Sequence, residues 1–213
     1  MKNMKIILVV ILAVIAVLPA SAQISLGVLG GLNIANLDMD EGDMGDAEFA
    51  SRTVFGFGGI LDYSISENIA LRLEPMYLQK GADIVIDGYD DQFIVKLSYF
   101  EVPMMFKYSF SGDNINPYIM AGPSIGFLLE AKTEVIVSGV SEETDIKDET
   151  SNIDFSLGFG AGVSLPMGTN SIFVDARYAL GLTNIVDDPD APDDDVKNKG
   201  IQIFAGISFP VGG

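Results

Sequence analysis

Residues 99–110 decide the fold, and they read YFEVPMMFKYSF. The even positions of this stretch are all apolar: Phe100, Val102, Met104, Phe106, Tyr108 and Phe110. The odd positions include Glu101, Lys107 and Ser109. Side chains along a β-strand point alternately to its two faces, so this period of two predicts a strand with one wholly apolar face and one polar face.

Two later segments repeat the alternation. In residues 172–180 the apolar even positions alternate with Asp175 and Arg177. In residues 153–165 the odd positions are apolar, and the other face carries a row of glycines: Gly158, Gly160 and Gly162. A soluble barrel of the lipocalin type would also alternate, with its apolar face buried. The glycine row favours a membrane barrel, because it is too small for a solvated face and suits a narrow lumen.

Aromatic residues on the apolar faces lie near the predicted strand ends. One group contains Tyr63, Tyr108, Phe110 and Phe209, and the other contains Tyr77, Phe100 and Tyr178. Two such girdles are typical of barrels that cross a membrane.

Eight apolar, glycine-rich segments read as strands: 24–35, 53–65, 68–82, 94–110, 117–133, 153–166, 170–184 and 200–210. Short gaps alternate with long acidic ones, and the long gaps are 36–52, 83–93, 134–152 and 185–199. Short turns at one rim and long loops at the other are typical of barrels in bacterial outer membranes. We therefore predict an all-β fold, an eight-stranded antiparallel up-and-down transmembrane β-barrel with short periplasmic turns and long acidic extracellular loops.

Residues 1–22 have the pattern of a cleaved signal peptide. Lys2 and Lys5 precede an apolar run from Ile6 to Leu18, and small residues then occupy positions 20–22. A membrane-anchoring helix is the alternative, but a run of 13 apolar residues is shorter than the roughly 20 that span a bilayer. We expect export to the outer membrane of a Gram-negative bacterium, with residues 23–213 as the barrel domain.

The chain carries 12 basic and 30 acidic residues, yet 48% of its residues are hydrophobic. Removing residues 1–22 takes away two lysines and no acids, so the net charge of −18 becomes 10 − 30 = −20. Nucleic acid is excluded as a partner, because binding its phosphates needs a basic surface. The absence of cysteine excludes a lipoprotein and a disulfide scaffold.

Several short motifs occur in order along nearly all of the mature chain: GVLGGLN at 27–33, LEPMY at 73–77, YFEVP at 99–103, AGP at 121–123 and DARY at 175–178. Together they resemble the outer-membrane β-barrel domain family of Bacteroidetes-type bacteria, often labelled porin family or PorT-like. Pro75, Pro103 and Pro123 lie inside predicted strands, where each removes a hydrogen-bond donor. The resemblance implies that this barrel type tolerates prolines at these places.

Carrying the alternation through the strands places charged residues inside the barrel: Asp62, Arg72, Glu74, Glu101, Lys107, Glu130, Asp175 and Arg177. A narrow barrel is filled by side chains rather than by water, so isolated charges there would be costly and mutual pairing is expected. The structural role of such a charge network is one interpretation, and a path for ions or protons is the other.

Neither enzyme activity nor a cofactor is expected. The chain has no histidine, whereas the known lipase, acyltransferase and protease barrels of the outer membrane rely on it. No arrangement of a nucleophile with a base is visible in the sequence either.

The last predicted loop is rich in aspartate: Asp187, Asp188, Asp190, Asp193, Asp194 and Asp195. Clustered carboxylates suit hard cations such as calcium, but their spacing does not match the calcium loop with glycine at its sixth position and glutamate at its twelfth. Two interpretations stay open: solvated surface charge bridged by divalent ions within lipopolysaccharide, and a specific calcium site. No metal site is firmly predicted.

Three functions fit the sequence. The leading hypothesis is a small non-enzymatic protein that supports the envelope or contacts surfaces through its acidic loops. The PorT-like resemblance implies an accessory factor in secretion or envelope assembly. A narrow channel for small solutes is the third, although general porins have about 16–18 strands. Expected partners are outer-membrane lipid, lipopolysaccharide, the barrel-insertion machinery during assembly and an unidentified surface or secretion partner; we expect a monomer.

Overall fold

The computed structural model describes residues 23–39, 47–86, 92–112, 114–137, 139–187 and 195–211. The predicted signal peptide, residues 1–22, lies outside the described residues. So do four aspartates of the last predicted loop: Asp188, Asp190, Asp193 and Asp194. Within the described ranges, no helix is long and apolar enough to cross a membrane.

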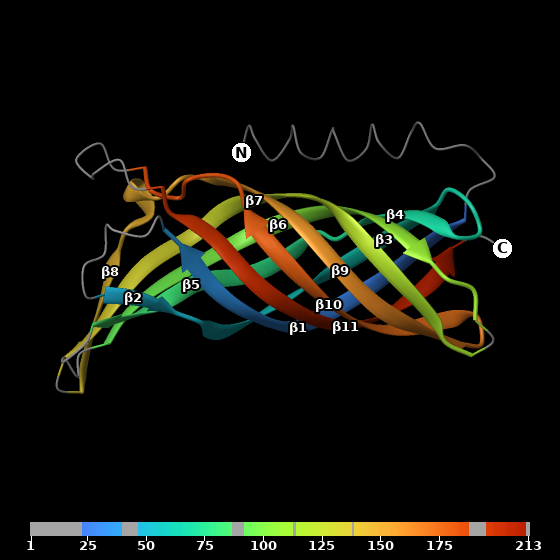
Figure 1. Ribbon diagram of the computed structural model, residues 1–213, viewed down its shortest axis with the longest axis horizontal. Helices are drawn as coiled ribbons and strands as arrows, with labels where there is room; N and C mark the ends of the chain where they lie inside the picture. Colours follow the sequence, from blue (N-terminus) through green and yellow to red (C-terminus); the bar gives the residue numbers. More distant parts are fainter. Residues whose placement is uncertain are drawn as a thin grey trace.

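Antiparallel strands close into one ring (Figure 1). Its members are β1 (Ile24–Asp38), β3 (Arg52–Ser64), β4 (Ile69–Leu73), β5 (Met76–Ile86), β6 (Gln92–Ser109), β7 (Asn116–Val137), β9 (Ile153–Met167), β10 (Asn170–Gly181) and β11 (Lys197–Val211). β1 pairs with β3 on one side and with β11 on the other, which closes the sheet. β4 and β5 share one position between β3 and β6. The ring therefore has the eight positions that the sequence predicts.

The described residues contain eleven strands rather than eight. One extra strand comes from the division between β4 and β5. The other two are β2 (Ala47–Ala50), which pairs with β5, and β8 (Val140–Asp145), which pairs with β7. A short helix, η1 (Lys147–Glu149), follows β8. Ordered structure thus extends into the predicted gaps 36–52 and 134–152. The sequence did not reveal β8, because all six of its residues are exposed and carry no alternation.

The two ends of the barrel differ. The connections after β3, β6 and β9 are short and lie at the same end as the start of β1 and the finish of β11. We call this the turn end. The opposite end carries β2, β8 and η1 and is called the loop end (Figure 1).

The alternation predicted for residues 99–110 is confirmed, and the faces are arranged for a membrane. On β6, Glu101 and Met105 are each 2% exposed, whereas Phe106 is 59% exposed. The polar face therefore points into the barrel and the apolar face points outward. A continuous apolar exterior matches a lipid environment rather than water.

The three prolines within the predicted strands lie where the sheet is interrupted. Pro75 falls between β4 and β5, and its carbonyl accepts a hydrogen bond from the Gly59 N–H at 3.0 Å. The Glu74 N–H donates to the Pro103 carbonyl at 3.1 Å. The ladder between β6 and β7 stops at Pro103 and resumes three residues later, with Pro123 opposite the gap. The missing donors thus fall at breaks in the ladder, where they cost little.

Replacing Gly162 with alanine should destabilise the barrel, because the glycine row lies against crowded lumen side chains. A Cβ at Gly162 would lie 2.6 Å from Asp175 Cβ and 2.6 Å from Tyr118 Cζ. Overpacking of this kind costs about 1–3 kcal/mol. Gly158→Ala is the matched control, since its Cβ would meet the flexible end of Met105 at 3.2 Å. Urea unfolding in detergent should give a lower midpoint for Gly162→Ala than for Gly158→Ala, and equal midpoints would contradict this account.

Candidate functional site

Five charged residues of the lumen form what we call the arginine cluster: Asp62, Arg72, Glu74, Asp175 and Arg177. They come from β3, β4, β10 and the break after β4, and each is at most 8% exposed. Asp62 and Arg72 are cross-strand partners. Arg72 donates through Nε to Asp62 Oδ1 at 2.7 Å and through Nη2 to Oδ2 at 2.6 Å. Such a two-pronged contact is the strongest form of ion pair that these groups make.

Arg177 connects opposite parts of the ring. Its guanidinium donates two hydrogen bonds to the carboxylate of Glu74, one of them from Nη2 to Oε1 at 2.9 Å. It also donates through Nε to Asp175 Oδ1 at 2.7 Å. The Tyr118 hydroxyl donates to Asp175 Oδ2 at 2.8 Å. The Phe204 ring covers one face of the guanidinium, with 5.1 Å between Cζ and the ring centroid. Each of the two acids beside Arg177 thereby has a cationic partner within the lumen.

A second group, the lysine cluster, contains Lys80, Glu101 and Asp154 and lies closer to the loop end. Lys80 Nζ is 2.5 Å from Glu101 Oε2 and 3.1 Å from Asp154 Oδ2. Ser124 donates its hydroxyl to Glu101 at 2.9 Å, and Asn198 donates its amide to Asp154 at 2.9 Å. The lysine is 5% exposed and each acid at most 2%. One cation therefore serves two buried carboxylates, with neutral donors completing their hydrogen bonds.

The structure places Glu130 outside the lumen, so the prediction for this residue is wrong. In the ladder between β6 and β7, Ser98 faces Glu130 but Tyr99 faces Leu128, which leaves Leu129 without a partner. This β-bulge adds one residue to β7 and reverses the alternation beyond it. Glu130 instead forms an exposed ion pair with Lys132 at 2.6 Å.

The other predicted lumen residues divide between the two clusters and one separate position. Asp62, Arg72, Glu74, Asp175 and Arg177 form the arginine cluster, and Glu101 belongs to the lysine cluster. Lys107 lies apart from both, with Nζ 4.2 Å from the centroid of the Tyr118 ring. Among the described residues, no acid lies within ion-pair distance of Lys107.

Sequence reasoning missed Lys80 and Asp154. Lys80 has the same even parity as Arg72 and Glu74, so extending the alternation past Pro75 would have found it. Asp154 is the second residue of the predicted strand 153–166 and stands on its polar face, so the same alternation would have found it. The pairing of the two across 74 residues of sequence depends on ring closure, which a single strand pattern cannot show.

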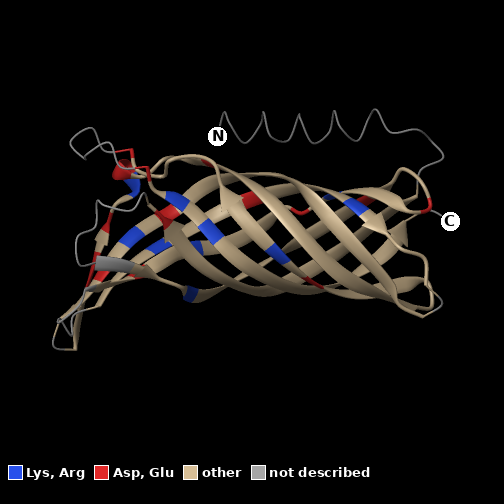
Figure 2. Ribbon diagram, in the orientation of Figure 1, with Lys and Arg blue, Asp and Glu red and all other residues tan. Residues whose placement is uncertain are grey.

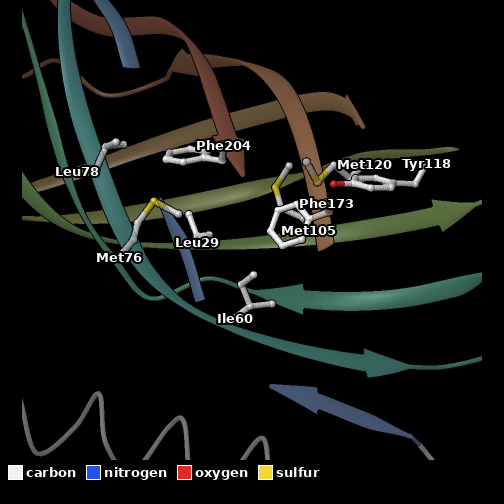
Figure 3. Packing of buried hydrophobic residues seen from close by; sticks show 9 residues of the cluster. All are labelled: Leu29, Ile60, Met76, Leu78, Met105, Tyr118, Met120, Phe173 and Phe204. Atoms are coloured by element: carbon white, nitrogen blue, oxygen red, sulfur yellow. The ribbon is translucent and has the colours of Figure 1, made fainter. Parts of the chain in front are cut away.

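Apolar side chains fill the lumen beside the arginine cluster (Figure 3). The buried group consists of Leu29, Ile60, Met76, Leu78, Met105, Tyr118, Met120, Phe173 and Phe204. The Phe173 ring lies 4.8 Å from Arg72 Cζ, so the apolar group and the ion pairs are in direct contact. The lumen is therefore packed like a protein core and not open like a pore.

At the loop end, β6 and β7 extend beyond the ring, and charged residues of both signs gather there (Figure 2). β7 pairs with β9 as far as Phe127, and further along it pairs with β8. In this extension Lys96 Nζ is 2.5 Å from Glu134 Oε2 and 2.6 Å from Glu143 Oε1. These hydrogen bonds raise the pKa of Lys96, and the Lys96 contact holds the pKa of Glu143 below its usual 4.5. The contact of Glu143 with Lys96 therefore stabilises the fold above pH 4.5, and this contribution is lost as the pH falls through the lowered pKa of Glu143. The contribution from Lys96 is lost only at alkaline pH, as the pH rises through the raised pKa of the lysine.

Two of the six aspartates proposed as a divalent-ion loop are described. The Asp187 N–H donates to the Glu149 carbonyl at 2.9 Å, and Asp195 pairs with Lys197. Within the described residues, no group of three or more potential ligands could hold a metal ion. The calcium site stays a hypothesis, because most of its members lie outside the described residues.

A closed ring of antiparallel strands, with an apolar exterior and paired charges inside, defines a small outer-membrane β-barrel. The chain belongs to the outer membrane protein beta-barrel domain family, whose model matches residues 20–187. Family and fold indicate an outer-membrane location. Membership of the PorT-like group of Bacteroidetes-type bacteria stays a prediction.

Solved structures share this architecture at low sequence identity. The outer membrane protein OprG from Pseudomonas aeruginosa is 12% identical, with a TM-score of 0.51 over 92% of this chain and 98% of that chain. Neisserial surface protein A is 18% identical, with a TM-score of 0.45 over 86% of this chain and 96% of that chain. No curated protein matches the chain by sequence. The similarity to OprG shows the fold alone.

Replacing Arg177 with methionine should strongly destabilise the barrel, because Glu74 and Asp175 would stay buried without their cation. Breaking a buried ion pair by removing one partner costs about 3–5 kcal/mol. The temperature at which the refolded barrel loses its compact mobility on a gel should fall. Lys132→Met is the control, since it removes a partly exposed lysine from its pair with the exposed Glu130 and should leave that temperature unchanged. Equal behaviour of the two variants would contradict a structural role for the arginine cluster.

Proposed function

We propose that the protein is a non-enzymatic outer-membrane barrel with a closed lumen, which acts through its loop end in envelope structure or in contacts at the cell surface. The packed lumen carries this proposal. Arg72, Tyr118 and Phe204 come from three different strands, and each is at most 1% exposed. Barrels inserted from the periplasm keep their short turns on the periplasmic side of the membrane, so the loop end would face the cell exterior.

The alternative of a narrow channel is less well supported. A solute crossing the barrel would have to pass between the side chains of both charged clusters and of the buried apolar group. It would also have to displace the two-pronged contact of Arg72 with Asp62 and the contact of Arg177 with Glu74. Eight-stranded barrels leave space for side chains but not for a continuous column of water.

The loop end offers an ordered surface for contacts. The extension of β6 and β7 with β8 is stabilised by ion pairs, and it exposes apolar residues among its charges. Val140 is 71% exposed and Val137 45%. An enzyme is not supported, because the chain lacks histidine and the buried acids of the lumen are held in ion pairs.

Recordings from planar lipid bilayers test the closed lumen. The refolded mature chain, residues 23–213, should give no discrete conductance, whereas a general porin in the same bilayers should give clear steps. Regular steps from this chain would contradict the proposal and favour the narrow channel.

Shortening the β7–β8 hairpin tests the role of the loop end. Lys132 and Asp145 are cross-strand partners, so an Asn-Gly turn can join them in place of residues 133–144. The shortened barrel should still fold, as judged by its compact gel mobility. Cells that express it should become as sensitive to detergent and bile salts as cells without the gene. Full resistance with the shortened barrel would show that the hairpin is dispensable.

A further inference from the structure

The turn end contains a pocket of about 170 Å³, and Asp62 and Arg72 of the arginine cluster form part of its wall. One water molecule needs roughly 10–15 Å³ of such space, so the pocket can hold several waters or a small ion. It opens at the rim formed by the short connections. Its walls are formed by residues of β1, β3, β4, β6, β9, β10 and β11 and of the turn after β3.

Serine hydroxyls surround this pocket. Six of the seven serines come from β1, β3, β6, β9, β10 and β11: Ser25, Ser64, Ser109, Ser164, Ser171 and Ser208. The seventh, Ser66, lies in the turn after β3 and accepts a hydrogen bond from the Ile69 N–H. Within the described part of the chain, none of these six side chains makes a hydrogen bond to another residue. Six hydroxyls from six strands are therefore available to a ligand that accepts hydrogen bonds.

Two cationic side chains line the same pocket. Lys107 makes no ion pair with a described residue, as noted above. Arg72 is 1% exposed, and Nε and Nη2 are bound to Asp62. Its Nη1 has no hydrogen-bond partner, although it lies 3.7 Å from Glu74 Oε1. The pocket also contains Glu67, which is exposed in the turn after β3. Asp62 also lines the pocket and is bound to Arg72, so Lys107 is the cation of the interior wall that makes no ion pair with a described residue.

We propose that this pocket binds a phosphate group, either as the free ion or as a small phosphate monoester. The Lys107 ammonium supplies the charged contact, and serine hydroxyls donate to the remaining oxygens. A phosphate accepts hydrogen bonds in several directions, which suits donors spread around a ring. A cation is disfavoured by Lys107 and Arg72. This inference goes beyond the proposed function, because it concerns the opposite end of the barrel and does not depend on whether the lumen conducts.

Titration calorimetry on the refolded mature chain, in a maltoside detergent without phosphate, tests the proposal. Inorganic phosphate should bind saturably at millimolar concentrations, and sodium chloride at equal ionic strength should not. Lys107→Met should weaken binding about tenfold, as expected for losing a charge-assisted contact. Lys132→Met is the matched control at the loop end and should bind like the native protein.

A second variant guards against a folding defect in Lys107→Met. The pair of substitutions Ser164→Ala and Ser171→Ala keeps all charges and should also weaken phosphate binding, while the unfolding temperature stays native. Glycerol phosphate distinguishes the two candidate ligands. Tighter binding of glycerol phosphate than of inorganic phosphate would identify a phosphate monoester as the ligand, and equal or weaker binding would identify the free ion. Absence of saturable binding up to 50 mM phosphate (roughly the weakest useful range), or native affinity in Lys107→Met, would overturn the proposal.

Discussion

The contact between Arg177 and Glu74 determines how the interior of this barrel is organised. It joins residues 103 positions apart in sequence and crosses the lumen from β10 to the break after β4. Removing a charge from water costs several kcal/mol, so such a group is stable inside a barrel only with partners of good geometry. Arg177 meets this condition through Glu74 and Asp175, and the Phe204 ring excludes water from one face. The apolar group can then pack directly against paired charges.

Much of the fold follows from a period of two in the sequence. Because the side-chain direction in a strand depends on parity alone, Glu101 and Met105 could be assigned to the lumen from residues 99–110. Glu130 could not, because the β-bulge at Leu129 changes parity and has no clear sequence signature. The breaks at the strand prolines were equally hidden, since they depend on hydrogen bonds such as that from Glu74 to Pro103.

The sequence could predict which charged residues lie in the lumen, but not which acid pairs with which base. The alternation places Arg72, Glu74 and Arg177 inside the barrel, but which acid meets which base depends on the curvature of the closed ring. Lys80 and Asp154 illustrate this: they are far apart in sequence and meet across the lumen. The β8 extension was missed for a different reason, because water surrounds it and no buried face constrains its residue pattern.

Identical residue types have different roles along the barrel axis. In the lumen, ion pairs are shielded from water and pack against apolar side chains. In the β6–β7 extension, Lys96 and Glu143 interact in water, where salt and pH modulate them. The bulge at Leu129 lies between the lumen and the β6–β7 extension, and it affects how the length of the extension can vary among relatives. Since parity decides which side of the extension each residue occupies, length changes beyond Leu129 preserve both faces when residues are gained or lost in pairs. The projecting hairpin can thus lengthen or shorten over evolution in steps of two without disturbing the membrane-embedded ring.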